Sequence, residues 1–282
     1  MADFWRRFRR NIGAVVGLVI LVLVGLTAVL APIVFPFSPW EMRGVPFMPP
    51  GEMGFLLGSD SLGRDVAAGI AHGTLVSLLV GGVSTVVALA IGITLGAVAG
   101  YAGGRVDDAV MRFTEFFQTI PSFVLAVVLV AIFTPSITSI VIAIAIVSWP
   151  PVTRVVRAEF LSLRSREFVQ AAEVLGRSRI AIMLTEILPN ALSPIIVLSS
   201  LMVATAILLE SALSFLGLGD PNLMSWGFMI GAGRSVIRLA WWMSVFPGIA
   251  IFLTVLALNL VGEGLNDALN PRLARRRGMV VT

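Results

Sequence analysis

Long runs without a charged side chain dominate the hydrophobic pattern of this 282-residue chain. A helix that crosses the hydrocarbon core of a bilayer needs about 20 consecutive apolar residues, and several of the runs exceed that length. Residues 116–153 are long enough for two spans, with a division near Pro135. The sequence therefore predicts an all-α membrane protein with six transmembrane helices. The other four spans are expected near residues 12–34, 75–100, 190–217 and 239–266.

The composition supports a membrane protein and excludes several kinds of site. Charged residues make up 13% of the chain and hydrophobic residues 57%, whereas soluble domains carry about 25% charged residues. There is no cysteine and only one histidine, His72, so we expect neither a disulfide framework nor a metal site. All 20 basic residues are arginine, and a P-loop for ATP needs a lysine. We therefore expect no catalytic, cofactor or metal residues in this chain, with ATP and magnesium bound by partner subunits.

The arginines predict the orientation in the membrane. If the N-terminus is cytoplasmic, sixteen of the 20 arginines lie in cytoplasmic segments, as the positive-inside rule requires. Both termini and the polar segment 154–189 are then cytoplasmic. Because the arginines segregate by membrane side and not along one soluble face, nucleic acid is excluded as a partner. The outer arginines are Arg43, Arg64, Arg234 and Arg238.

The polar segment 154–189, which we call the elbow, is the only long polar stretch between spans. Its pattern predicts two short amphipathic helices. Gly176 stands between them, where a helix end favours a residue that tolerates positive φ, and Ser178 is placed to cap the second helix. The expected apolar faces are Leu161, Phe168, Ala172 and Leu175 in the first helix, and Ile180, Met183, Leu184 and Ile187 in the second.

The elbow contains the spacing Gln170–Ala171–Ala172–x3–Gly176–x11–Leu188–Pro189. This spacing resembles the EAA loop of ATP-binding-cassette (ABC) importer permeases, the element that docks on the cytoplasmic ATPase. The chain further resembles the C-type permease of dipeptide and oligopeptide importers. That resemblance rests on LGSDSLGRD at 57–65, AGYAGGRVDDAVMR at 99–112 and SFLGLGDPNLMSWGFMI at 214–230. Gln170 departs from the family's glutamate, which would change an ion pair with the ATPase into a neutral hydrogen bond.

The resemblance implies a type I ABC importer transmembrane domain in a bacterial cytoplasmic (inner) membrane. It implies a first span and outer loop at 1–70, the transmembrane domain at 71–268 and a basic cytoplasmic tail at 269–282. The implied partners are a second, B-type permease in a heterodimer, two P-loop ATPases, an external solute-binding protein and a peptide substrate. The chain itself is then a transport subunit and not an enzyme. The residues expected to couple to the ATPase are Gln170, Ala171, Ala172, Glu173, Gly176, Leu188 and Pro189.

Two further polar groups are candidates for function. Glu210 lies within a span, where a carboxylate is costly, so it has either a role in translocation or a structural one. Asp60, Arg64 and Asp65 form an outer cluster that serves either to dock the solute-binding protein or to hold a local turn.

Two other features are assigned to packing and local structure. Gly92, Gly96 and Gly100 are spaced so that helices approach closely within the subunit. The charged residues at 105–112 are expected to form local ion pairs in a cytoplasmic loop.

Alternative functions remain open at this point. The same machinery would serve a nickel chelate, glutathione or another small solute. A secondary transporter would be driven by an ion gradient, but the elbow and the lack of matching repeats disfavour it. A membrane-anchored sensor or assembly protein would keep the elbow without transporting anything.

Overall fold

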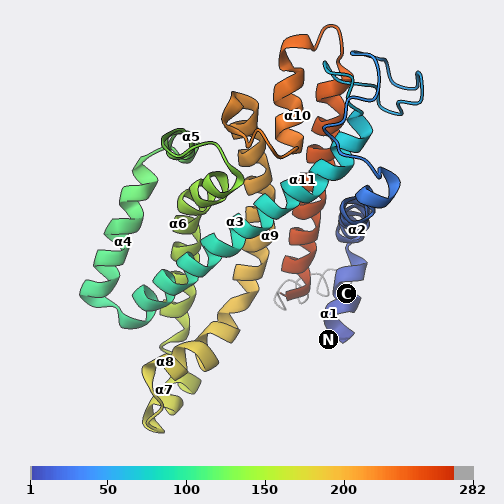
Figure 1. Cartoon of the computed structure of the whole chain (residues 1–282). Coiled ribbons are helices and arrows are strands. Elements are labelled where there is room, and N and C mark those ends of the chain that lie inside the picture. Colours follow the sequence, from blue (N-terminus) through green and yellow to red (C-terminus); the bar gives the residue numbers. More distant parts are fainter. Residues whose placement is uncertain (1, 270–282) are drawn as a thin grey trace.

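The computed structural model describes residues 2–269, and these fold into a helical bundle (Figure 1). Two isolated β-bridges, Met42 with Arg64 and Ser59 with Asp65, tie together the outer loop. The longer helices are α1 (Ala2–Arg10), α2 (Ile12–Val34), α3 (Val66–Ala102), α4 (Gly104–Thr119), α5 (Ser122–Ile132), α6 (Ile137–Leu163), α7 (Glu167–Val174), α9 (Leu188–Leu213), α10 (Trp226–Gly233) and α11 (Trp242–Leu269). The shorter ones are α8 (Arg179–Ala181), η1 (Ile182–Ile187), η2 (Ser214–Leu218) and η3 (Arg234–Val236).

Five stretches in the described range are long and apolar enough to cross a membrane: α2, α3, α6, the continuous run 179–218 and α11. A sixth span is reached if α4 and α5 are taken as one element bent by 83°. The predicted all-α, six-span architecture is thus confirmed, but the position of the third span is wrong. The expected span after residue 116 is instead the eleven-residue α5, which follows a bend at Ile120 and Pro121. Proline disfavours helical geometry in the residue before it, and Ile120 is extended at φ −91° and ψ 128°.

The second span begins at Val66, nine residues before the predicted start near residue 75. Asp65 caps this helix, because its side chain accepts hydrogen bonds from the backbone N–H groups of Ala67 and Ala68. The resulting 37-residue helix is about 55 Å long, which exceeds the thickness of the hydrocarbon core. It runs obliquely through the bundle and joins the outer loop to the opposite end (Figure 1).

Close packing of α3 against α6 forms the centre of the bundle. A Cβ atom added at Gly96 would lie 2.7 Å from both the Thr153 carbonyl oxygen and the Val156 Cβ atom. One added at Gly100 would lie 2.6 Å from the Phe160 Cβ atom. The predicted packing role of Gly92, Gly96 and Gly100 is confirmed, since only glycine permits this approach.

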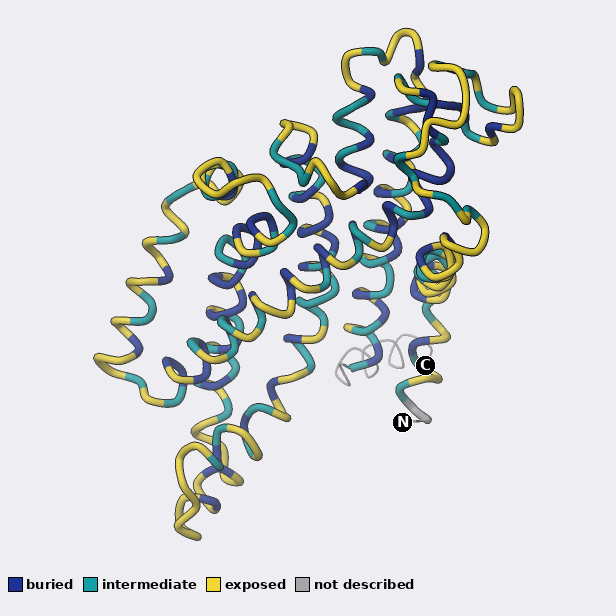
Figure 2. The backbone as a smooth tube through the Cα atoms, viewed as in Figure 1, coloured by how far each residue is buried: buried dark blue, intermediate teal, exposed yellow. Residues whose placement is uncertain are grey.

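The two ends of the bundle differ in character. The outer loop 35–65 and α10 lie at one end, whereas α1, the elbow and the described end of α11 lie toward the other (Figure 1). Burial concentrates where α3, α6 and α9 meet, and α2 exposes much of its apolar surface (Figure 2). The arginines of the predicted tail, at 272 and 275–277, lie outside the described residues.

Candidate functional site

The first elbow helix, α7, ends in a specific turn at Gly176. Gly176 has φ +74°, in the left-handed region, as its position in the sequence predicted. Its N–H donates to the Glu173 carbonyl at 2.9 Å, and the Arg177 N–H donates to the Ala172 carbonyl at 3.2 Å. These two bonds form a Schellman motif, which satisfies helix-terminal carbonyls and fixes the direction in which the chain leaves the helix.

The second elbow helix continues into the next span without a break. The Ser178 hydroxyl accepts a hydrogen bond from the Ala181 N–H at 3.3 Å, which confirms the predicted cap. The chain then passes through α8 and the π-helix η1 into α9, with Pro189 in the first turn of α9. A π-helix brings residues five apart onto one face, so Ile182 and Ile187 are buried together. The predicted face is therefore wrong for Ile180 and Leu184, which are exposed, although Ile187 is buried as expected.

The apolar residues of α7 divide between the bundle and the surface. Val169 and Ala172 are buried against the same core as Ile182 and Ile187. The predicted face was wrong for Phe168 and Leu175, because α7 is rotated so that both are exposed. The elbow tip consequently presents uncovered apolar side chains. Their exposed fractions are 88% for Val174, 80% for Leu175 and 70% for Ile180.

The residues of the predicted coupling motif lie together on this elbow. Gln170, Ala171 and Glu173 are exposed, and Ala172 faces the core. The Gln170 amide nitrogen is 3.4 Å from the Ser165 carbonyl oxygen, so this side chain contacts its own turn. Leu188 is half-buried, and Pro189 is exposed at the entry to α9.

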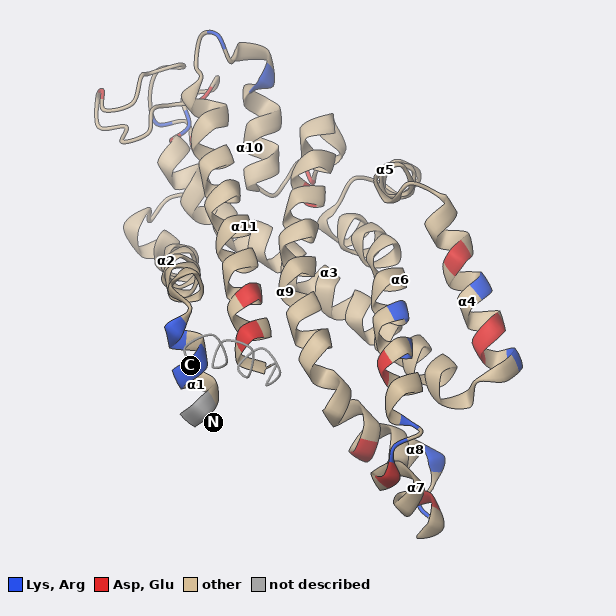
Figure 3. Ribbon diagram, turned by 180° about the vertical axis from the view of Figure 1, so that it is seen from behind, with Lys and Arg blue, Asp and Glu red and all other residues tan. Residues whose placement is uncertain are grey.

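Polar contacts that the motif did not reveal anchor the elbow to the bundle. Arg177 in the turn pairs with Glu186 of η1, which braces the two elbow helices. The Tyr101 hydroxyl at the end of α3 donates to Glu173 at 3.3 Å. Arg164 lies 3.4 Å from the carbonyl oxygens of Gly100 and Tyr101. Between these elements opens a groove of about 490 Å³, lined by Tyr101, Arg164, Glu173 and Arg179, among others. Figure 3 shows how charge gathers at this end of the molecule.

A bidentate ion pair fixes α4 to α6 above the elbow. The Arg157 guanidinium donates through Nε to one oxygen of Asp107 and through Nη2 to the other, the second bond measuring 2.6 Å. Such parallel bonds are stronger and more directional than a single contact. The pairing differs from the expected local ion pairs within 105–112, because the partner of Asp107 lies fifty residues away on another helix.

Glu210 is 2% exposed near the C-terminal end of α9. One of its carboxylate oxygens accepts hydrogen bonds from the hydroxyls of Ser214 at 2.8 Å and Ser225 at 2.7 Å, and Ser211 lies 3.4 Å from the other. Ser225 also caps α10 by accepting from the Phe228 N–H. Glu210 thereby links α9 to the start of α10. These contacts favour the structural alternative, while a role in translocation stays a prediction.

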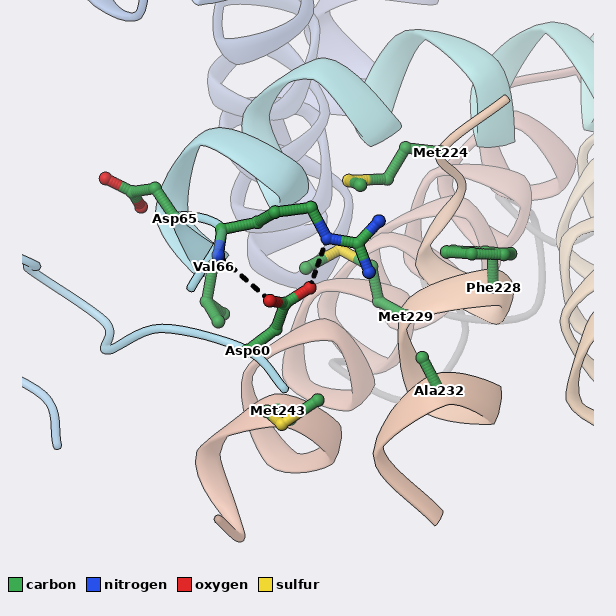
Figure 4. Close-up of a pocket in the computed structure, with 9 residues that line it drawn as sticks. Asp60, Asp65, Val66, Met224, Phe228, Met229, Ala232 and Met243 are labelled. Carbon is green, nitrogen blue, oxygen red and sulfur yellow. Dashed lines mark hydrogen bonds and ion pairs between the residues drawn. The ribbon is translucent and has the colours of Figure 1, made fainter. Parts of the chain in front are cut away.

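The outer cluster forms a compact turn (Figure 4). The Arg64 Nε atom lies 2.5 Å from one Asp60 oxygen, and the other Asp60 oxygen accepts from the backbone N–H groups of Leu62 and Arg64. Asp65 points elsewhere, to the first turn of α3. Asp60 and Arg64 line a small cavity of about 20 Å³ with Met224, Met229 and Met243. The geometry favours the local-turn alternative, and docking of a binding protein here stays a prediction.

In the described part of the chain, no group of three or more His, Cys, Asp or Glu side chains is placed to hold a metal ion. The elbow, with its braced turn and exposed apolar tip, is the feature best suited to bind another protein.

Comparisons with known proteins agree with this geometry. Residues 92–275 match the family model described as "Binding-protein-dependent transport system inner membrane component". Residues 1–50 match the "N-terminal TM domain of oligopeptide transport permease C". In fold, the chain is similar to the MetNI methionine ABC transporter in inward-facing conformations, with a TM-score of 0.60 at 15% identity over 72% of this chain and 96% of that one.

Curated relatives are similar over almost the whole chain. The di/tripeptide transport system permease protein DppC of Pseudomonas aeruginosa is 41% identical over 97% of this chain and 92% of its own length. The dipeptide transport system permease protein DppC of Escherichia coli K12 is 44% identical, over 97% and 93%. The oligopeptide transport system permease protein OppC of Haemophilus influenzae is 39% identical, over 96% and 88%. The chain therefore belongs to the family of inner-membrane components of binding-protein-dependent transport systems.

Proposed function

We propose that this chain is a permease subunit of an ATP-driven ABC importer that moves di- and oligopeptides into a bacterial cell by alternating access. The peptide cargo is supported by the names of the relatives, which are peptide permeases at 39–44% identity. The full assembly would contain a second, B-type permease, two ATPases and a solute-binding protein. ATP and magnesium would be bound by the ATPases.

The elbow is the observation that carries this proposal. Its tip exposes Val174, Leu175 and Ile180 far beyond what a water-facing turn requires. Apolar side chains that stand together on a polar, arginine-rich segment are typical of a surface that another protein covers. The tip is also held rigidly, by the Schellman turn and the Arg177–Glu186 pair. Rigidity lets a movement of the docked ATPase pass directly into α6 and α9, which flank the elbow.

The orientation follows from the same end of the molecule. The elbow and α1 carry ten of the 20 arginines and lie toward one end of the bundle (Figure 3). By the positive-inside rule, that end would be cytoplasmic, where an ATPase has access to the elbow. The outer loop and α10 would then face the solute-binding protein.

Co-purification tests the proposed assembly. The tagged chain, extracted from its native membrane in mild detergent, should bring down a second permease and P-loop ATPases, identified by mass spectrometry. Replacing Leu175 by aspartate at the elbow tip should abolish ATPase recovery while the second permease is retained. The matched control is Leu56→Asp, because Leu56 is also highly exposed, at 71%, but lies in the outer loop.

Two outcomes would contradict the proposal. Recovery of this chain alone, with uptake driven by an ion gradient, would indicate a secondary transporter. Recovery of the ATPases with a binding protein that takes a nickel chelate or glutathione but no peptide would keep the machinery and change the cargo.

A further inference from the structure

Helix α4 presents three different faces. Asp107 and Thr114 are buried toward the bundle, where Asp107 pairs with Arg157 of α6. Val106 and Phe113 are exposed and apolar and lie on one face at i, i+7, as on a helix that contacts lipid. A third face is both exposed and polar. It consists of Asp108, Arg112, Glu115 and Thr119, which follow the helical spacing i, i+4, i+7, i+11. We call these four residues the polar stripe of α4.

Two aromatic contacts fix the level of Glu115 along α6. The rings of Phe113 and Phe117 lie 5.7 and 5.3 Å from the ring of Trp149 on α6. Trp149 is twelve residues, or about 18 Å, from the start of α6 at Ile137. The first charged residue of α6, Arg154, follows Trp149 by about 7 Å. Because Glu115 stands between Phe113 and Phe117 in sequence, it lies within the apolar length of α6.

A carboxylate at this depth cannot be left facing lipid. Ionisable groups inside a membrane face a water-filled cavity or pair with another group. Within residues 2–269, no other side chain forms an ion pair or hydrogen bond with that of Glu115 or Arg112. Residues two positions apart in an α-helix point about 200° away from each other. Glu115 is two positions from both Phe113 and Phe117, so it points away from the face that carries them. The stripe must therefore face water or a group outside the described chain.

The charges of the stripe match those of a free peptide. Arg112 and Glu115 are three residues apart, so their Cβ atoms are about 5–6 Å apart on one face. A short peptide is a zwitterion, with an ammonium group at one end and a carboxylate at the other. Glu115 is complementary to the first group and Arg112 to the second.

We propose that the polar stripe of α4 lines the water-filled translocation pathway, with Glu115 binding the α-ammonium group of the passing peptide and Arg112 its carboxylate. This inference rests on the proposed function, and it gives the charged side chains of α4 a role other than local ion pairing. The apolar face with Val106 and Phe113 then faces lipid and α6, and the Asp107–Arg157 pair holds α4 in that rotation.

Uptake by the intact importer in proteoliposomes tests the role of the charge. Glu115→Gln should lower the uptake of a free dipeptide about tenfold or more, because a hydrogen bond to a charged group contributes about 1.5–3 kcal/mol and 1.4 kcal/mol is tenfold. Glu115→Asp keeps the charge and should retain uptake within about threefold of the unsubstituted chain. Glu263→Gln, which removes the same charge from an exposed position on α11, should have no effect. ATP hydrolysis without cargo should be unchanged in all three variants.

Cysteine labelling tests the pathway independently. The chain contains no cysteine, so a single introduced thiol reports on one position. Glu115→Cys in the assembled importer should react with a water-soluble methanethiosulfonate, and an excess of dipeptide should protect it. Phe113→Cys, about 200° around the helix and about 3 Å along it, should react at least tenfold more slowly. Labelling is read by mass spectrometry of this chain.

Two results would overturn the inference while leaving peptide import intact. A Glu115→Cys variant that labels no faster than Phe113→Cys would mean that protein covers the stripe. Full dipeptide uptake by Glu115→Gln would mean that the carboxylate does not bind the cargo. If Glu115→Gln does not assemble, protection of the cysteine variant by dipeptide still decides. Failure of the unsubstituted importer to take up any peptide would instead refute the proposed function.

Discussion

Replacing Gly176 by valine is expected to uncouple ATP hydrolysis from transport without preventing membrane insertion. Gly176 has φ +74°, and its N–H and that of Arg177 form the Schellman bonds at 2.9 and 3.2 Å. A Cβ atom added at Gly176 would meet nothing within 4 Å, so the main cost of the substitution is conformational. The change therefore acts on the geometry of the turn alone.

The magnitude follows from the left-handed conformation. An L-residue with a Cβ atom adopts it at a cost of about 1–2 kcal/mol, and a β-branched residue lies at the upper end. A cost of that size reduces the population of the correctly formed turn by a factor of roughly 5–30. Asparagine tolerates the same backbone region, so Gly176→Asn is the matched control and should behave nearly like the unsubstituted chain.

The assay measures ATP hydrolysed per peptide taken up in proteoliposomes that contain the whole importer. Gly176→Val should raise this ratio at least fivefold, with normal amounts of the protein in the membrane. Two results would refute the reasoning that the positive φ of the turn transmits the coupling movement. One is an unchanged ratio of ATP to peptide in the valine variant, and the other is an equal rise of this ratio in the valine and asparagine variants.

Two further substitutions test the packing of the bundle. Asp107→Asn should destabilise the permease by about 1–3 kcal/mol, because it breaks the bidentate bond to Arg157, whose side chain is partly exposed. The change is measured as a lower melting temperature in detergent. An unchanged melting temperature would show that the pair is not stabilising. Gly96→Val should reduce the folded yield, since the valine side chain would collide with Val156. The control is Gly82→Ala in the same helix, which should be tolerated because an added Cβ atom has no neighbour within 4 Å. Equal yields of the two variants would mean that α3 and α6 are not tightly packed.

Features set by local chemistry could be predicted from the sequence. The turn at Gly176 and the cap at Ser178 depend on a few neighbouring residues, and both were found. The glycine spacing at 92–100 likewise predicted a close contact between helices, which α3 makes with α6. The number of spans followed from the charge-free runs because bilayer thickness sets a minimum length for each span.

Features that depend on tertiary geometry could not be predicted in the same way. The 20-residue length rule gives a minimum, so it missed the outer extension of α3 to Val66, although Asp65 was a recognisable cap. Periodicity of 3.6 residues assigned the wrong face to the second elbow helix, because the π-helix pairs Ile182 with Ile187. The Asp107–Arg157 pair joins residues fifty positions apart in the sequence, so no spacing along the chain predicts it. The bend before Pro121 could have been predicted from the proline. It was missed because the spans were placed from the charge-free runs alone.

The most direct test of the central claim is dipeptide uptake by proteoliposomes that contain the purified chain with its co-purified partners. The account predicts uptake that requires ATP and the solute-binding protein, is unaffected by ionophores that collapse ion gradients, and is lost when the elbow tip carries Leu175→Asp. Uptake by this chain alone, driven by an ion gradient and indifferent to ATP, would contradict it.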